Sequence, residues 1–333
     1  MSQKIKALVL LSGGLDSLLA AKVLMDQGVS VTGLSFKSCF FNTINARVSA
    51  RSLGIELKEV DFSGEHLKMV KNPKYGYGKN MNPCIDCHSM MFRYAKCIKE
   101  EEGYDFVASG EVLGQRPMSQ NREALSIVAE YSGLNDLLLR PLSAKLLSET
   151  KPEKENWVNR GKLFHIKGRS RDEQMEMIKK FDLDSFATPG GGCLLTDPEI
   201  SQRLLQLFEF WPNCGVEDVE LIKSGRVFWA DFDQRKILIV VGREKQENEI
   251  LENLKLKNDI LMELESLPGP LTLIRGLEKI KEMKNQEVDV PKNKNMVKLK
   301  QENDLQNLLE YGAMLTGFYA VKARGTKVRI KIF

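Results

Sequence analysis

The feature that most constrains the fold is an apolar segment that runs through a glycine turn into a helical pattern. Residues 5–11 read IKALVLL, an uninterrupted apolar run typical of a strand buried on both faces of a parallel sheet. Ser12-Gly13-Gly14-Leu15-Asp16-Ser17 follows, and apolar residues at helical spacing continue to Gln27 before Gly28. The alternation continues with strands expected at 29–36, 55–62, 105–109, 137–142 and 163–167, and helices at 42–53, 85–101 and 171–181. It predicts an α/β fold with a doubly wound parallel sheet.

The pattern changes near residue 200, where the strict strand–helix alternation ends. Segments 226–231 and 236–241 look like an antiparallel pair of strands. Further elements are expected as a helix at 245–257, a strand at 271–274, a helix at 303–314 and strands at 318–323 and 326–332. Residues 281–300 are lysine-rich and poor in apolar side chains, and we expect them to form a linker or loop. A length of 333 residues fits about two domains, so we expect them at 1–200 and 201–333, the second a smaller α+β domain.

The hexapeptide Ser12–Ser17 has the properties of a phosphate-binding turn. Two glycines allow close backbone approach, and the N-terminus of the following helix offers unpaired N–H groups and the positive end of its dipole. Ser12 and Ser17 add hydroxyl groups, whereas Asp16 would repel a bare phosphate and so indicates a metal-bridged phosphate or a helix cap. An ordinary strand–helix turn remains an equal alternative on these grounds alone. The segment matches neither the Walker pattern nor the dinucleotide-binding fingerprint.

This segment resembles the PP-loop signature SGGxDS of the ATP pyrophosphatases. The resemblance implies that ATP binds there with Mg²⁺, and that its pyrophosphate is held by the loop while the α-phosphate is attacked. The ATP-binding residues that it implies in this loop are Ser12, Gly13, Gly14, Leu15, Asp16 and Ser17. Asp16 is also expected to take part in catalysis.

The chain shows no sign of export or membrane insertion. Its first residues lack an apolar signal core, and no stretch approaches the roughly 20 apolar residues of a membrane span. We therefore expect a cytoplasmic protein without a membrane partner. Thiols stay reduced in that compartment, so its six cysteines favour metal ligation or catalysis over disulfides.

Cys84 and Cys87 lie at the start of the expected helix at 85–101, and Cys193 follows a run of three glycines. The sequence C-x-x-C-H at 84–88 could attach a c-type haem, but the absence of an export signal weighs against this. A structural zinc site would need a fourth ligand besides His88. A thioredoxin-like dithiol and a three-cysteine iron–sulfur cluster remain, and spacing alone does not decide between them. Cys39, Cys97 and Cys214 are expected to be packed side chains, and His66 has no sequence neighbour that indicates catalysis.

Several segments together are similar to the tRNA thiouridine synthetases, over roughly residues 5–195. They are Cys84-x-x-Cys87 with Met91 and Arg93, Asn82-Pro83, the run 109–115 (SGEVLGQ) with Ser119-Gln120, and Arg140-Pro141-Leu142. The resemblance implies that Cys84, Cys87 and Cys193 serve sulfur transfer, in some members as ligands of a [4Fe–4S] cluster. It makes Cys84 and Cys193 catalytic candidates and places Gly110 and Gln115 at the ATP site. It also implies tRNA as substrate and sulfide or a persulfide carrier as sulfur donor, and a homodimer is a further expectation.

The C-terminal part contains Val241-Gly242-Arg243-Glu244 followed by Asn248, then Asp259 and Pro268-Gly269-Pro270. In patches over about residues 226–332 these resemble the NFACT-R region, and the resemblance implies RNA binding. The net charge is only +4, from 49 basic and 45 acidic residues, so any nucleic-acid surface must be local. Basic residues that could contact phosphates are Lys281, Lys284, Lys292, Lys294, Lys298, Lys300, Lys322, Arg324, Lys327, Arg329 and Lys331. The alternative is a solvated surface diluted by acidic neighbours.

These observations predict an ATP-dependent tRNA sulfurtransferase. It would adenylate a uridine carbonyl and replace the oxygen with sulfur, of the 4-thiouridine or the 2-thiouridine type. A PP-loop ligase or amidotransferase acting on a small substrate would need the loop but not the three cysteines. A non-catalytic RNA-binding or sulfur-trafficking protein would need the cysteines but not an intact Ser12–Ser17.

Overall fold

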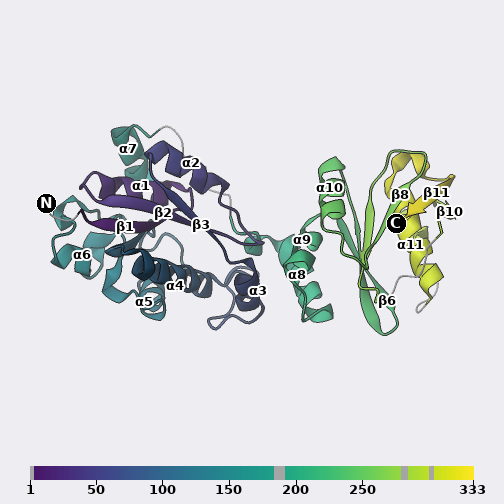
Figure 1. The fold of residues 1–333 in the computed structure, drawn as a ribbon, viewed down its shortest axis with the longest axis horizontal. Coiled ribbons are helices and arrows are strands. Elements are labelled where there is room, and N and C mark those ends of the chain that lie inside the picture. The colour runs from purple at the N-terminus through teal and green to yellow at the C-terminus, as the bar shows by residue number, and fades with distance from the viewer. Residues whose placement is uncertain (1–3, 184–191, 279–283, 300–303) are drawn as a thin grey trace. The chain divides into compact units, whose positions relative to one another are not determined.

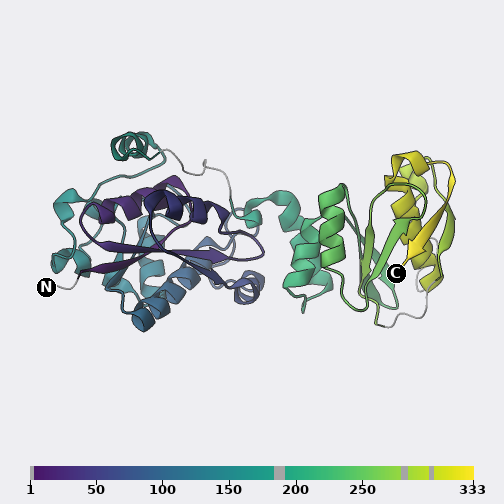
Figure 2. The ribbon, with the colours of Figure 1, turned by 45° about the horizontal axis from the view of Figure 1, so that its top comes forward.

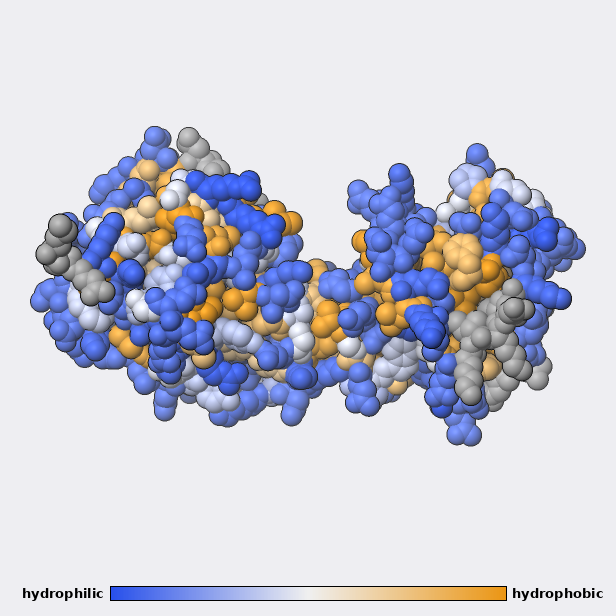
Figure 3. Space-filling model, in the orientation of Figure 1, coloured by the Kyte–Doolittle hydropathy of each residue, from blue (hydrophilic) through white to orange (hydrophobic). Residues whose placement is uncertain are grey.

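The computed structural model describes residues 4–183, 192–278, 284–299 and 304–333. The chain divides into two compact units, residues 1–198 and 199–333, and each is described by itself (Figure 1). The face of each unit drawn in Figure 3 is mainly hydrophilic, with smaller hydrophobic patches. Within the described residues, no helix combines the length and apolar character needed to cross a bilayer.

The first unit is built on a parallel sheet of five strands in the order β3-β2-β1-β4-β5. The strands are β1 (Lys6–Leu10), β2 (Ser30–Lys37), β3 (Leu57–Asp61), β4 (Phe106–Ser109) and β5 (Leu138–Leu139). The chain winds outward from β1 through β2 to β3 and then returns to β4 on the other side of β1. This confirms the predicted doubly wound α/β fold, and it puts the point where the strand order reverses between β1 and β4.

Helices cover both faces of this sheet, and the alternation of side chains along β1 shows why. Ala7 and Val9 pack with α1 (Leu15–Met25) and α7 (Asp172–Phe181), whereas Leu8 packs on the opposite face. That opposite face is covered by α4 (Cys84–Glu102) and α5 (Arg122–Tyr131). Figure 2 shows the purple and indigo helices α1 and α2 (Ile44–Leu53) on one side and the blue helices on the other. A strand buried on both faces explains the uninterrupted apolar run.

Some predicted elements of the first unit are wrong or incomplete. Helices α3 (Ser63–Lys71), α5 and the single-turn α6 (Lys151–Lys154) were not expected. The strand expected at 137–142 has only two residues, because Pro141 cannot donate a ladder hydrogen bond and the chain turns at Arg140. The segment 163–167 forms no strand and makes a single parallel bridge between Lys167 and Leu113.

The second unit has an antiparallel sheet of six strands in the order β10-β11-β8-β9-β7-β6. Its strands are β6 (Arg226–Phe232), β7 (Arg235–Val241), β8 (Ile260–Leu264), β9 (Thr272–Arg275), β10 (Gln286–Asp289) and β11 (Lys327–Ile332). Its helices are α8 (Pro198–Phe210), α9 (Val216–Lys223), α10 (Lys245–Asn253) and α11 (Leu305–Tyr319). The core of the unit lies between α11 and the sheet.

Two predictions for the second unit are wrong. The strand expected at 318–323 is instead the end of α11 and a single 3-10 turn, because Leu308, Ala313 and Leu315 bury one continuous helical face against the sheet. The segment 281–300, expected to be a linker, contains β10 paired with β11, although residues 281–283 and 300 lie outside the described part. The alternation of buried and exposed side chains along β10 spans only four residues. This is too short to be recognised as a strand within a polar sequence.

A buried arginine joins three elements of the second unit. Arg275 at the end of β9 pairs with Asp259 at 2.7 Å and with Asp218 on α9 at 3.0 Å, and it donates to the carbonyl of Leu254 after α10. Arg275 and Asp259 are each only 4% exposed. Each charge is therefore tolerated only because the other is present.

We expect Arg275→Met to destabilise the second unit by about 3–5 kcal/mol, because it leaves the Asp259 carboxylate buried without its partner. Urea unfolding measures this in a Trp157→Phe background, where the remaining tryptophans, Trp211 and Trp229, both lie in this unit. The matched control is Arg235→Met, since Arg235 forms an exposed ion pair with Glu278 and its loss should cost less than about 1 kcal/mol. Equal losses in the two variants would contradict the structural role of Arg275.

Candidate functional site

The loop between β1 and α1 leaves the N-terminus of α1 without a side-chain cap. Gly13 has φ +83°, and a Cβ there would lie 2.2 Å from the backbone carbon of Asn45, so only glycine fits. The Ser17 hydroxyl donates to the carbonyl of Gly14 at 2.8 Å and lies 3.3 Å from the Ser12 hydroxyl. The first-turn amides of α1 have no partners within the helix, so this end of α1 can receive an anion.

The segment after β4 lies directly against this loop. A Cβ on Gly110 would come within 2.4 Å of the backbone of Asp16 and Ser17, so the two segments are in backbone contact. Gln115 Nε2 donates to Asp16 Oδ2 at 3.0 Å, and Gln174 Nε2 on α7 lies 3.2 Å from Asp16 Oδ1. The structure thus brings the predicted residues Asp16, Gly110 and Gln115 together at the end of adjacent strands. Gln174 is a site residue that sequence reasoning missed, because nothing near it in sequence marks it.

A buried charge network follows Gly110. Glu111 accepts hydrogen bonds from Arg140 Nε at 2.8 Å and from the Ser109 hydroxyl at 3.2 Å, and His88 Nδ1 lies 2.8 Å from its other oxygen. Burial alone would raise the pKa of Glu111, but Arg140 and His88 outweigh it and hold the pKa at about 2. The network ties the end of β4 to the first turns of α4, since His88 follows directly after Cys87.

The three predicted cysteines come from two separate parts of the first unit. Cys84 and Cys87 begin α4, and Cys193 lies just before the 3-10 turn Leu194–Thr196. Asn80 donates to the carbonyl of Thr196, which holds this turn beside the loop that precedes α4. Burial raises the pKa of all three thiols, that of Cys193 to about 11. The three thiols lie close enough to affect one another's pKa, so the structure brings the predicted set together, although residues 188–191 of the glycine-rich loop lie outside the described part.

Two further residues act on these thiols and were missed. His66 Nε2 lies 3.3 Å from Cys87 Sγ, and the ring stacks on Phe62 with centroids 4.8 Å apart. Burial lowers the pKa of His66 to about 4, so the ring is neutral at pH 7. Its Nδ1 has no hydrogen-bond partner among the residues that the structure describes. The exposed Arg116 lowers the pKa of Cys84 and of Cys193 against the larger effect of burial, which places a positive charge beside both thiols.

The three cysteines supply the thiolate donors that an iron–sulfur cluster uses. In the described parts of the chain, however, no group of three or more His, Cys, Asp and Glu side chains is already arranged to hold a metal ion. Cluster binding would therefore require these side chains to turn toward one centre. All six cysteines are free thiols. Cys97, expected to be packed, is exposed on α4, whereas Cys39 and Cys214 are buried as expected.

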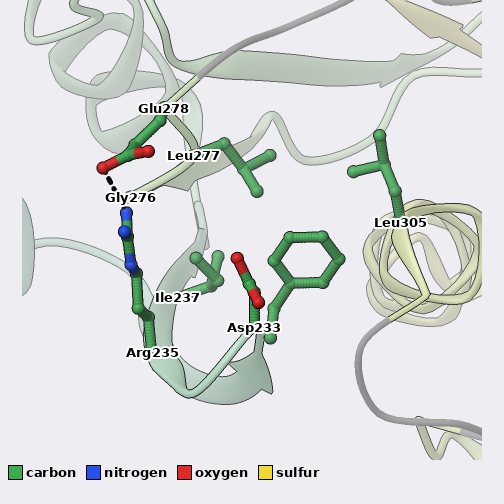
Figure 4. Close-up of a pocket in the computed structure, with 8 residues that line it drawn as sticks. Asp233, Arg235, Ile237, Gly276, Leu277, Glu278 and Leu305 are labelled. Carbon is green, nitrogen blue, oxygen red and sulfur yellow. Dashed lines mark ion pairs between the residues drawn. The ribbon is translucent and has the colours of Figure 1, made fainter.

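The positive charge on β11 of the second unit is less concentrated than the sequence indicates. Three basic residues of β11, Lys327, Arg329 and Lys331, form ion pairs with Glu287, Glu265 and Glu263. Such exposed pairs contribute little stability, but they lower the local positive charge. A hollow of about 130 Å³ lies between the β6–β7 turn and α11, and Figure 4 shows Arg235 paired with Glu278 at its rim. It is smaller than the pockets of about 300–1,000 Å³ that hold small-molecule ligands.

Comparisons with known proteins match both halves of the chain. Residues 2–160 match the family model "Thiamine biosynthesis protein (ThiI)", and residues 225–290 match "NFACT protein RNA binding domain". The tRNA-specific 2-thiouridylase MnmA of Marinobacter nauticus is 30% identical over 293 residues, which covers 82% of this chain and 72% of that protein. A probable tRNA sulfurtransferase of Methanothermobacter thermautotrophicus is 30% identical over 46% of this chain, and the chain spans 40% of it.

Solved structures of two related enzymes are more distant. A 4-thiouridine synthetase–RNA complex with bound ATP shares 22% identity, with a TM-score of 0.41 and coverage of 65% of this chain and 52% of that chain. The U34-tRNA thiolase NcsA of Methanococcus maripaludis, solved with its [4Fe–4S] cluster, shares 20% identity, with a TM-score of 0.29 and coverage of 65% and 69%.

The Glu111 network gives a prediction for the pH dependence of stability. Because the pKa of Glu111 is lower in the folded chain, its contribution is complete above about pH 4.5 and is lost as the pH falls toward about 2. We expect Glu111→Gln to be less stable than the natural protein by about 3 kcal/mol at pH 7, and the difference to shrink below pH 4.5. Unfolding free energies measured from pH 7 to pH 2.5 test this, with the exposed Glu130→Gln on α5 as control. A difference that stays constant across this range would contradict it.

Proposed function

The chain belongs to the PP-loop family of ATP-dependent tRNA sulfurtransferases, and from that premise we propose how its residues divide the reaction. One observation carries the proposal: the loop Ser12–Ser17 touches the segment Gly110–Gln115, and Glu111 links that segment to the helix that carries Cys84 and Cys87. A phosphate-binding turn and a group of thiols are thereby fixed on one edge of one sheet. A ligase acting on a small substrate would have no use for that thiol group.

We propose that ATP binds with its pyrophosphate at the N-terminus of α1. The uncapped amides of the first helical turn and the hydroxyls of Ser12 and Ser17 would hold the phosphate oxygens. Gln115 and Gln174 keep the Asp16 carboxylate in place, and a Mg²⁺ ion would neutralise its repulsion from the phosphates. The same donors would stabilise the charge that develops on the leaving pyrophosphate.

In the proposed first step, a uridine carbonyl oxygen attacks the α-phosphorus of ATP. A P–O bond forms to the base, the bond to pyrophosphate breaks, and pyrophosphate leaves. In the second step, a sulfur atom attacks the activated carbon and AMP departs with the former carbonyl oxygen. Sulfide would supply this sulfur directly. With a persulfide carrier, the outer sulfur would attack, and a cysteine thiolate would then break the S–S bond to release thiouridine and leave a disulfide between that cysteine and the carrier. The 4-thiouridine type is our primary assignment and the 2-thiouridine type its alternative.

We propose that Cys84, Cys87 and Cys193 deliver the sulfur, as ligands of a [4Fe–4S] cluster. Three cysteines on a four-iron cluster leave one iron open, which is where sulfide could be carried. His66 would then orient Cys87, and Arg116 would offset the negative charge of the thiolates.

For the second unit, we propose that it binds tRNA. The support is the match of residues 225–290 to an RNA-binding domain. The basic residues Lys327, Arg329 and Lys331 of β11 already form ion pairs with glutamates. The tRNA-binding surface would therefore have to involve other elements of the unit.

The thiolation reaction tests the proposal directly. Anaerobic incubation of the protein with ATP, sulfide and unmodified tRNA should yield thiouridine, measured by mass spectrometry of the digested nucleosides. We expect Cys84→Ala to lower the yield at least 100-fold, because sulfur can no longer be held beside the activated base. Cys97→Ala is the matched control, since Cys97 is an exposed thiol on the same helix and should leave the yield unchanged. A full yield from Cys84→Ala would contradict the assignment of the thiols.

Metal content tests the cluster separately from activity. Protein purified without oxygen should contain about four iron and four sulfide per chain and be coloured. Cys193→Ala should lose most of this iron, whereas Cys214→Ala should keep it. Iron-free protein that still makes thiouridine would contradict the cluster and favour a persulfide or disulfide at the same cysteines.

A further inference from the structure

Two exposed tyrosines meet on the first unit, close to the thiol helix. Tyr75 lies in the loop between α3 and α4, and Tyr131 is the last residue of α5. Their rings pack edge to face with centroids 6.1 Å apart, yet the two residues remain 38% and 42% exposed. Lys74 lies over both rings, with Nζ at 4.3 Å from the centroid of Tyr131 and 5.2 Å from that of Tyr75. Each ring therefore keeps an open part beside a fixed positive charge.

Lys74 is held differently from several other lysines of the first unit. Lys37, Lys58 and Lys96 each form an ion pair with a carboxylate. Among the residues that the structure describes, Lys74 forms no such pair and is held by aromatic rings instead. A cation–π contact orients the ammonium group but leaves its full charge, so an incoming anion finds no competing carboxylate.

A buried carboxylate fixes this arrangement. Asp86, only 6% exposed, accepts the backbone N–H of Lys74 at one oxygen and that of Tyr75 at the other, each at 3.0 Å. Asp86 lies between Cys84 and Cys87 in the first turn of α4. The turn of helix that carries two thiols therefore also positions Lys74 and Tyr75.

The charge of the loop indicates its partner. Residues 71–79 read KNPKYGYGK, with three lysines, two tyrosines and no acidic residue. Basic residues interleaved with exposed aromatic rings match an unpaired nucleic-acid strand, whose phosphates bind the cations while its bases stack on the rings. An apolar protein partner would leave the ammonium group of Lys74 without a counter-charge.

We propose that residues 71–79 and Tyr131 bind an unpaired segment of the RNA substrate next to the thiols. Lys74 contacts a phosphate, and an unstacked base packs on the open part of Tyr75 or Tyr131. This inference rests on the proposed tRNA substrate and adds which surface of the first unit receives the strand. Bases that are unpaired, as in a loop, are the ones that this surface can accept.

Binding of a fluorescein-labelled single-stranded RNA 12-mer and of an unmodified tRNA, measured by anisotropy with the full chain, tests the proposal. We expect Tyr75→Ala with Tyr131→Ala to weaken binding of the 12-mer by roughly 5- to 150-fold, the range for loss of one stacked base. Tyr75→Phe with Tyr131→Phe should restore it, because stacking does not need the hydroxyl. Lys74→Gln should make the slope of log affinity against log salt for the 12-mer shallower by about 0.7, the value for one phosphate contact on a single strand.

The matched control is Lys151→Gln, because Lys151 also lies over an aromatic ring, that of Trp157, in the same unit. It should leave both the affinity and the salt slope unchanged. Unchanged binding by both the double alanine variant and Lys74→Gln would overturn the proposal, as would tighter binding of an acidic peptide than of the RNA. Natural protein that binds the 12-mer through these residues but makes no thiouridine would overturn the proposed function and leave this surface standing.

Discussion

The rest of the site depends on the backbone contact between Gly110 and the first turn of α1. A side chain at position 110 would overlap the backbone of Asp16 and Ser17, so the end of β4 can reach the loop only as glycine. This contact lies where the strand order reverses, which is where open parallel sheets bind ligands. The contact allows Gln115 to hold Asp16, and it brings Glu111 to the edge of the sheet where β4 ends. The phosphate-binding turn and the thiol-bearing helix therefore share one rigid support.

Two buried carboxylates hold the thiol helix, and one of them, Glu111, connects it to this support. Glu111 joins β4 to His88, and Asp86 joins the same helix to the loop that carries Lys74 and Tyr75. Each carboxylate is satisfied by several donors, which is the condition under which a charge can be buried. Cys87 lies between Asp86 and His88, and Cys84 is two residues before Asp86 in the same turn of α4. The thiols are thus positioned with respect both to the nucleotide loop and to the proposed RNA surface.

Local patterns in the sequence predicted the parallel sheet, the loop Ser12–Ser17 and the start of α4, because each depends on neighbouring residues. Short elements were harder: β5 ends after two residues at Pro141, and the run 318–323 reads equally well as strand or helix. The roles of His66, Gln174 and Arg116 could not be predicted, because each acts on a residue at least 21 positions away in sequence. Only the fold brings His66 to Cys87 and Gln174 to Asp16. The number of basic residues in the C-terminal strands also overestimated their free positive charge, because these side chains form ion pairs across the sheet.

We propose that one site activates a uridine oxygen with ATP and then replaces it with sulfur. The most direct measurement uses tRNA whose target uridine carries ¹⁸O, at C4 in one reaction and at C2 in another, and follows the mass of the released AMP. We expect one ¹⁸O atom in AMP for each thiouridine formed, from one of the two labelled positions. Unlabelled AMP in both reactions, or release of ADP and phosphate instead, would contradict adenylation of the base.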